Sequence, residues 1–227
     1  MDRIRIFLWG SVVLNILLVI VVILTTCPHN DGINMKVSEC LKGWTKSLES
    51  LHDTVDVVFF GNSITHQGPF DNTFSELKIC NLGYPSDDLI GMKERIRQIT
   101  VLHPRMVFVM GGVNGLTDKT IWQFKEEYDS LVQNMVFNLP DTQIFLESIL
   151  PVNKGIKNYN VPEARKIQQA NSIIQSISEK YKCIYIDLYS LYSEDGVLPP
   201  RFTEDGVHLK EEAYTIWIEK IKSYIYE

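Results

Sequence analysis

Residues 55–65, VDVVFFGNSIT, combine a short apolar run with an abrupt polar turn. Val55 to Phe60 is almost wholly apolar, and Gly61 ends the run. A continuous apolar run of this length is typical of a strand that is buried on both faces, as in a parallel sheet. The stretch therefore predicts a buried parallel strand, with Asn62 and Ser63 placed just beyond its carboxyl end.

Four similar apolar runs follow along the chain, and helical stretches separate them. The runs are Ile79 to Leu82, Met106 to Met110, Ile144 to Leu150 and Cys183 to Leu188, and the helical stretches are roughly 86–100, 119–138, 161–181 and 209–226. Alternation of this kind predicts an α/β fold. We expect a flavodoxin-like three-layer sandwich over residues 53–227, with a five-stranded parallel sheet in the order 2-1-3-4-5 and helices on both faces.

The N-terminal segment, residues 1–26, has a different character. Ile6 to Leu24 is almost wholly apolar and follows Arg3 and Arg5. As a helix it would reach about 28 Å, close to the hydrocarbon thickness of a bilayer. We favour an uncleaved membrane anchor, with lipoprotein processing at Cys27 or ordinary signal cleavage as alternatives. In each case the rest of the chain is exported, to the periplasm or the cell surface.

Residues 27–52 are expected to form a stalk that leads into a first helix, since a turn-rich start is followed by apolar residues at helical spacing. Cys27 and Cys40 lie in this part, and their pairing stays open. Cys80 and Cys183 fall on the two outer strands of the expected sheet, which excludes a disulfide between them.

Composition excludes several classes of function. The 227 residues include 28 Asp and Glu against 22 Lys and Arg, for a formal net charge of -6, and no basic run is present. A nucleic-acid partner is therefore not expected. The four Cys form no C-x-x-C pair, and no other metal-ligand spacing is present, so neither a metal nor a cofactor is expected.

Residues that could take part in a reaction follow the predicted strands. Ser63 comes after the first, Gly83 after the second and Asn114 after the third, while Asp205 and His208 precede the last helix. Ligands of open α/β sheets bind beyond the carboxyl ends of the strands. A hydroxyl, an imidazole, a carboxylate and amide donors are the groups that acyl transfer requires.

These blocks resemble those of the SGNH (GDSL-type) hydrolase family over about residues 53–226. Gly61-Asn62-Ser63-Ile64, Gly83, Gly112-x-Asn114 and Asp205-x-x-His208 are similar to four family blocks, in the same order. Two positions depart from the family pattern: Asn62 stands where Asp is usual, and Gly115 stands where Asp is frequent.

The resemblance implies roles for individual residues. Ser63 would be the nucleophile, His208 the general base and then the acid, and Asp205 the group that orients His208. The backbone N–H groups of Ser63 and Gly83, with the side-chain amide of Asn114, would form an oxyanion hole.

Each residue also has a purely structural explanation. Ser63 could cap the helix that follows it, Gly83 could be a turn glycine, and Asn114 could be a loop residue that bonds its own backbone. Asp205 could cap the final helix. The near-duplicate Glu194-Asp195-Gly196-Val197 lacks a following His and predicts a plain turn.

Four further side chains have weaker assignments. His66 and Asn153 are candidates for substrate contact, with a surface role as the favoured alternative for His66, whereas Glu147 and Trp122 are assigned structural roles.

Three functions remain open. The first is an exported serine esterase that removes small acyl groups, acetyl above all, from carbohydrate. The second is a lysophospholipase or thioesterase that acts on longer acyl chains, which a membrane anchor would suit. The third is a glycan-binding module without catalysis, which the complete set of catalytic residue types disfavours.

Overall fold

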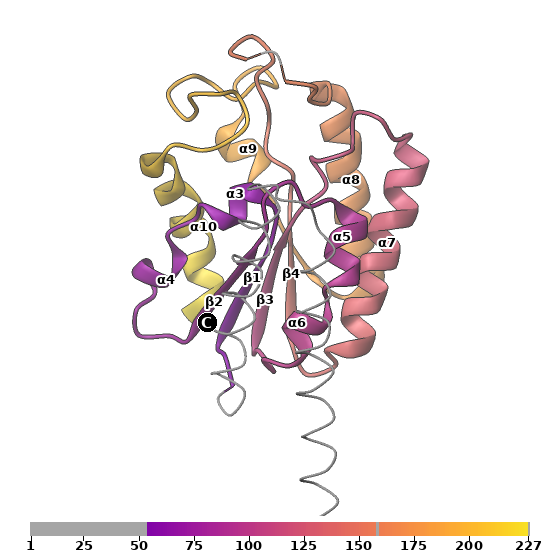
Figure 1. Cartoon of the computed structure of the whole chain (residues 1–227), viewed down its shortest axis with the longest axis vertical. Helices are drawn as coiled ribbons and strands as arrows, with labels where there is room; N and C mark the ends of the chain where they lie inside the picture. Colours follow the sequence, from indigo (N-terminus) through magenta and orange to yellow (C-terminus); the bar gives the residue numbers. More distant parts are fainter. Residues whose placement is uncertain (1–53, 158, 227) are drawn as a thin grey trace, which may run out of the picture. The chain divides into compact units, whose positions relative to one another are not determined.

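The computed structural model of this chain describes residues 54–157 and 159–226 (Figure 1). The predicted anchor, the stalk, Cys27 and Cys40 lie outside these residues and stay predictions. Protease digestion of intact cells would test the anchor, since an exported domain is cleaved before the cells are lysed. Among the described helices, none is long and apolar enough to cross a bilayer.

A five-stranded parallel sheet forms the centre of the described region. Its strands are β1 (Val57–Gly61), β2 (Ile79–Gly83), β3 (Met106–Met110), β4 (Gln143–Glu147) and β5 (Ile184–Ile186). Every pairing is parallel, and the order is β2-β1-β3-β4-β5. The predicted fold class and sheet order are thus confirmed. The register aligns Gly61 of β1 with Gly83 of β2 and Met110 of β3, so three strands end at the same level.

The fourth strand is shorter than its apolar run predicted. The run continues to Leu150, but β4 ends at Glu147. Beyond it, the side chain of Asn171 bonds both the N–H and the carbonyl of Ile149, at 2.8 and 2.9 Å. The Asn171 amide therefore supplies the hydrogen bonds that a neighbouring strand would otherwise provide. Ile149 and Leu150 are still buried, but they are no longer part of the sheet.

Helices cover both faces of the sheet. They are α3 (Ser63–His66), α4 (Phe70–Thr73), α5 (Leu89–Glu94), α6 (Arg97–Thr100), α7 (Ile121–Asn138), α8 (Ala164–Tyr181), α9 (Tyr189–Tyr192) and α10 (Tyr214–Tyr226), with a 3-10 turn, η1, at Glu211–Ala213. The start of α7 is fixed by a capping box between Thr120 and Gln123.

Alternate strand residues pack into two separate cores. Val58, Phe60 and Val109 point into one core with α5 to α8, whereas Phe59 and Phe108 point into the other with α3, α4 and α10. Figure 1 shows α7 and α8 on one side of the sheet and α4 and α10 on the other. Burial on both faces explains why the central strands β1 and β3 are continuous apolar runs rather than alternating ones.

The predicted helix over 86–100 is broken into two short helices. Asp88 caps α5, because its side chain accepts hydrogen bonds from the N–H groups of Ile90 and Gly91. Arg95 ends α5 with φ -104° and ψ 14°, outside the helical region, and α6 begins at Arg97. The break turns the Arg95 side chain toward the sheet, where it makes several polar contacts.

Glu147 is buried at the end of β4, in agreement with its structural assignment. Trp217 of α10 donates a hydrogen bond from Nε1 to its Oε1 at 2.6 Å. Burial raises the pKa of Glu147 to about 8, although the Trp217 bond opposes this shift. The carboxyl group is therefore predominantly protonated at neutral pH and tolerates its apolar surroundings.

Candidate active site

Ser63 lies directly beyond the carboxyl end of β1, as the first residue of α3. The residue that caps this helix is Asn62, whose side-chain oxygen accepts a hydrogen bond from the Ile64 N–H at 2.9 Å. The alternative role of Ser63 as a helix cap is thus not observed, and its hydroxyl is left for another partner.

That partner is His208, although 145 positions separate the two residues. The distance from Ser63 Oγ to His208 Nε2 is 2.9 Å. On the other side of the ring, His208 Nδ1 lies 2.7 Å from Asp205 Oδ2. The hydroxyl, the imidazole and the carboxylate therefore form one continuous chain of hydrogen bonds.

The surroundings of Asp205 keep its carboxyl group ionised. Partial burial alone would raise the pKa of Asp205. Hydrogen bonds from the His208 ring and from the N–H groups of Val207 and His208 outweigh burial and lower this pKa to about 2. One carboxylate oxygen accepts both backbone N–H groups, at 2.9 and 2.8 Å, so the other faces the imidazole.

The turn that carries Asp205 and His208 is separate from the last helix. η1 begins at Glu211 with Lys210 as its cap, so Asp205 does not cap a helix. Gly206 has a φ of 89°, and a Cβ at this position would lie 2.1 Å from the carbonyl oxygen of Asn153. Only glycine fits such a close approach. The near-duplicate turn at Glu194–Val197 closes on itself through an isolated bridge, as a plain turn.

Asn153 has a structural role in this arrangement. Its N–H donates to the Gly206 carbonyl at 2.7 Å, and its Nδ2 donates to the Leu198 carbonyl at 2.9 Å. Its Oδ1 accepts the N–H of Gly155. These bonds tie the segment after β4 to the turn of Asp205 and His208, so Asn153 supports this turn.

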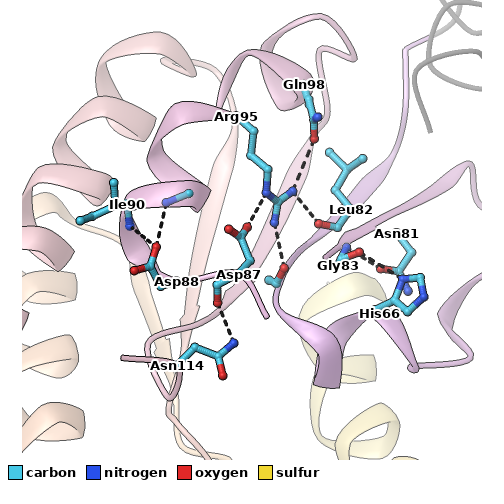
Figure 2. A network of polar contacts seen from close by, with 12 residues as sticks. His66, Asn81, Leu82, Gly83, Asp87, Asp88, Ile90, Arg95, Gln98 and Asn114 are labelled. Carbon is cyan, nitrogen blue, oxygen red and sulfur yellow. Dashed lines mark hydrogen bonds and ion pairs between the residues drawn. The ribbon is translucent and has the colours of Figure 1, made fainter. Parts of the chain in front are cut away.

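Asn114 is held by the loop between β2 and α5. Its Nδ2 donates to the backbone carbonyl of Asp87 at 2.8 Å (Figure 2). The alternative, in which Asn114 bonds its own loop, is therefore not observed. An amide nitrogen carries two hydrogens, so this bond fixes the group and leaves the second hydrogen for another acceptor.

Gly83 is placed differently from what its predicted role requires. Its N–H donates to Asn81 Oδ1 at 2.9 Å, and Asn81 Nδ2 donates in turn to the Thr65 carbonyl at 2.9 Å. A Cβ on Gly83 would lie 2.2 Å from the N atom of His66. The residue thus lets α3 approach β2, and its N–H is engaged within the protein.

His66 is exposed, and its Nδ1 lies 3.2 Å from the Gly83 carbonyl oxygen. It does not line the cleft that opens beside His208. That cleft has a volume of about 590 Å³ and is bounded by Gln67, Lys157, Glu204, Asp205, His208, Leu209, Lys210, Glu211 and Glu212. Leu209 is the single apolar residue among them, so the space next to the imidazole is strongly polar.

Sequence patterns did not indicate two residues next to this site, Arg95 and Asp87. They form a buried ion pair in which Arg95 Nε lies 2.6 Å from Asp87 Oδ2, and Figure 2 shows it beside Asn114. A charged side chain within an otherwise helical stretch usually faces solvent, so the spacing alone gave no signal. Within the described residues, no cluster of three or more His, Cys, Asp or Glu could hold a metal. Cys80 and Cys183 are not joined by a disulfide.

Comparison with known proteins identifies a family. The family model of the GDSL-like Lipase/Acylhydrolase family matches residues 59–216. A search of curated proteins found no match.

Solved structures share the fold at low sequence identity. A protein from Streptococcus pneumonia, described as a candidate platelet activating factor, is 21% identical, with a TM-score of 0.69 over 87% of this chain and 100% of its own. A GDSL-like lipase from Bacteroides thetaiotaomicron is 24% identical, with a TM-score of 0.62 over 75% and 87%. An acetyl xylan esterase is 18% identical, with a TM-score of 0.61 over 75% and 99%.

Proposed function

The chain belongs to the GDSL-like lipase/acylhydrolase family, a family of ester hydrolases, and we propose that it is a serine esterase that removes small acyl groups, acetyl above all, from carbohydrate. The observation that carries the proposal is the hydrogen-bonded chain from Ser63 through His208 to Asp205. Such a chain is how an alcohol becomes a nucleophile at neutral pH.

In the proposed reaction, Ser63 Oγ attacks the carbonyl carbon of the ester, and its proton passes to His208 Nε2. The tetrahedral intermediate collapses when His208 gives this proton to the leaving alcohol, and an acyl group stays on Ser63. A water molecule then attacks the acyl carbon, with His208 again accepting and returning a proton. Asp205, with its pKa lowered to about 2, stays ionised and stabilises the imidazolium in both halves.

The oxyanion of the intermediate needs preorganised donors. The Ser63 N–H and the free hydrogen of the Asn114 amide are two of them in this proposal. Ser86, in the loop that holds Asn114, has a φ of 64°, and its N–H bonds none of the residues that the structure describes. Strained backbone clusters at functional sites. We therefore assign the third donor to Ser86, because the Gly83 N–H is engaged by Asn81.

A structure of the fluorophosphonate adduct of Ser63 would test these donors. The phosphonyl oxygen stands in for the oxyanion. It is expected about 2.7–3.1 Å from the N–H groups of Ser63 and Ser86 and from Asn114 Nδ2. If that oxygen instead contacts the Gly83 N–H after Asn81 has turned away, the assignment returns to Gly83.

The polar cleft supports the choice of substrate. A long acyl chain gains affinity by burying methylene groups, at about 0.8 kcal/mol each. The cleft beside His208 offers one apolar side chain, Leu209, against many groups that can bond hydroxyls. A sugar alcohol fits such a lining better than an alkyl chain does. One of the proteins that share the fold is an acetyl xylan esterase, 18% identical to this chain, which is in line with a carbohydrate ester as the substrate.

A panel of p-nitrophenyl acetate, butyrate and laurate tests the proposed function. We expect turnover of the acetate, with kcat/KM falling as the chain lengthens. Activity that rises toward the laurate would support the longer-chain alternative instead. If none of the three is hydrolysed while Ser63→Ala and the wild type bind glycans equally, the protein is a binding module.

A further inference from the structure

The ion pair between Arg95 and Asp87 connects the end of β1 to the loop that holds Asn114, because Arg95 also bonds Gly61 and Asp87 belongs to this loop. Figure 2 shows Arg95, Asp87 and Asn114 side by side. The side chains of Arg95 and Asp87 are only 14% and 8% exposed. Burial raises the pKa of Asp87, and the Arg95 charge opposes this shift. Removing one partner would thus leave a buried charge without its counterpart, which makes the pair sensitive to substitution.

The Arg95 guanidinium reaches the ends of two strands. Its Nη2 donates to the Gly61 carbonyl and its Nη1 to the Leu82 carbonyl, each at 2.8 Å. Its Cζ lies over the Phe60 ring, 4.2 Å from the ring centroid. Gly61 precedes Ser63 by two residues, and pairing with β2 and β3 already holds this strand end, so the guanidinium is attached to a fixed point near the nucleophile.

The same guanidinium fixes the loop on the other side. Arg95 Nε binds the Asp87 carboxylate, and the Asp87 carbonyl accepts the hydrogen bond of Asn114 Nδ2. A Cβ on Gly91 would lie 2.1 Å from Asp87 Oδ1, so glycine here leaves room for the carboxylate. A short chain of contacts therefore leads from the strand end before Ser63 to the Asn114 amide.

A purely structural role does not explain this pattern well. β1 and β2 are already paired along their whole length, through the register that ends at Gly61 and Gly83. Apolar residues of similar volume usually stabilise a buried site at least as well as an ion pair does. What the guanidinium adds is direction, because its N–H groups form a fixed fork.

We propose that Arg95 and Asp87 are positioning residues that set the placement of the Asn114 amide relative to Ser63. The inference rests on the proposed function in one respect, namely that this amide meets an oxyanion. The geometric part, that Arg95 controls the Asn114 amide, can be measured without any catalysis.

The main variant is Arg95→Lys, which keeps the charge but replaces the fork by a single ammonium group. We expect kcat on p-nitrophenyl acetate to fall about 10- to 100-fold with KM nearly unchanged, since small displacements of an active-site group have costs of this order. Asn114→Ala should lower kcat by about 10²–10³. Because Arg95 acts through Asn114, adding Arg95→Lys to Asn114→Ala should lower kcat less than about threefold further.

Two further variants accompany this double-mutant cycle. Arg97→Lys makes the same chemical change at an exposed position of the next helix and should leave kcat unchanged. Asp87→Asn keeps the backbone carbonyl and the side-chain shape but removes the charge, and it replaces Arg95→Lys if that variant does not fold. Asp87→Asn should likewise lower kcat with KM nearly unchanged.

The second measurement is the NMR signal of the Asn114 side-chain NH₂, assigned by its disappearance in Asn114→Ala. It should shift in Arg95→Lys and stay in place in Arg97→Lys. An unshifted signal, or an equal loss of kcat with and without Asn114, would overturn the inference. A shifted signal in a protein that hydrolyses no ester would refute the proposed function and leave the positional link intact.

Discussion

Replacing Ser63 by alanine is expected to abolish ester hydrolysis, with kcat lowered by about 10⁴–10⁶. In the proposed mechanism, the variant loses the oxygen that forms the acyl intermediate, while His208 and Asp205 keep their places. Within residues 54–157 and 159–226, the Ser63 hydroxyl makes one hydrogen bond, to His208, and the cap of α3 belongs to Asn62. The melting temperature should therefore change little. Turnover of p-nitrophenyl acetate and the melting curve are measured on the same preparation.

Covalent labelling identifies the nucleophile independently of turnover. A fluorophosphonate probe should modify the wild type at Ser63, as located by peptide mass spectrometry, and should leave the alanine variant unlabelled. Ser176→Ala, on the exposed surface of α8, is the matched control and should be labelled like the wild type. Labelling that persists without Ser63 would mean that another residue is the nucleophile.

The centre of the sheet could be predicted from the sequence because β1, β3 and most of β4 are buried on both faces. Such strands are continuous apolar runs, and a run like Met106–Met110 contains no residue that suits another environment. Boundaries were less predictable where side chains replace backbone partners. Asn171 ends β4 by bonding Ile149, and Arg95 ends α5 by turning to the sheet. Both depend on residues that are distant in sequence.

The meeting of Ser63 and His208 could be predicted for a topological reason. Parallel strands place their carboxyl ends at one rim, so residues that follow different strands approach one another. The use of each hydrogen-bond donor could not be predicted in this way. Whether the Gly83 N–H is free depends on the rotamer of Asn81. The place of Asn114 depends on the Asp87 carbonyl, in a loop whose shape follows from the Arg95 contacts.

Removing the base is expected to cost more than neutralising the carboxylate. Among the described residues, His208 is the hydrogen-bond partner of Ser63 Oγ, so kcat of His208→Ala should fall about as far as in the serine variant, by about 10⁴–10⁶. Asp205→Asn keeps the imidazole beside Ser63 and should lower kcat by about 10²–10⁴. Both are compared with the wild type on p-nitrophenyl acetate, with folding checked by circular dichroism.

Asp205→Asn is expected to lower kcat, though less than His208→Ala does, because asparagine has fewer acceptor oxygens than aspartate. In the wild type, one oxygen of Asp205 accepts the N–H groups of Val207 and His208, and the other faces His208 Nδ1. An asparagine has one acceptor oxygen. Turned toward the imidazole, it presents an NH₂ group to two backbone donors. Turned toward the backbone, it presents NH₂ to the ring and favours the tautomer whose Nε2 cannot accept the Ser63 proton.

The chain offers a matched control in its near-duplicate turn. Asp195→Asn makes the same substitution in Glu194–Val197, at a residue with a φ of 52°, a conformation that asparagine tolerates well. It should leave kcat unchanged. If Asp205→Asn and His208→Ala lose activity equally while both stay folded, the carboxylate does more than orient and stabilise the ring. If Asp205→Asn keeps nearly full activity, His208 is held by its other contacts, and the catalytic group reduces to Ser63 and His208.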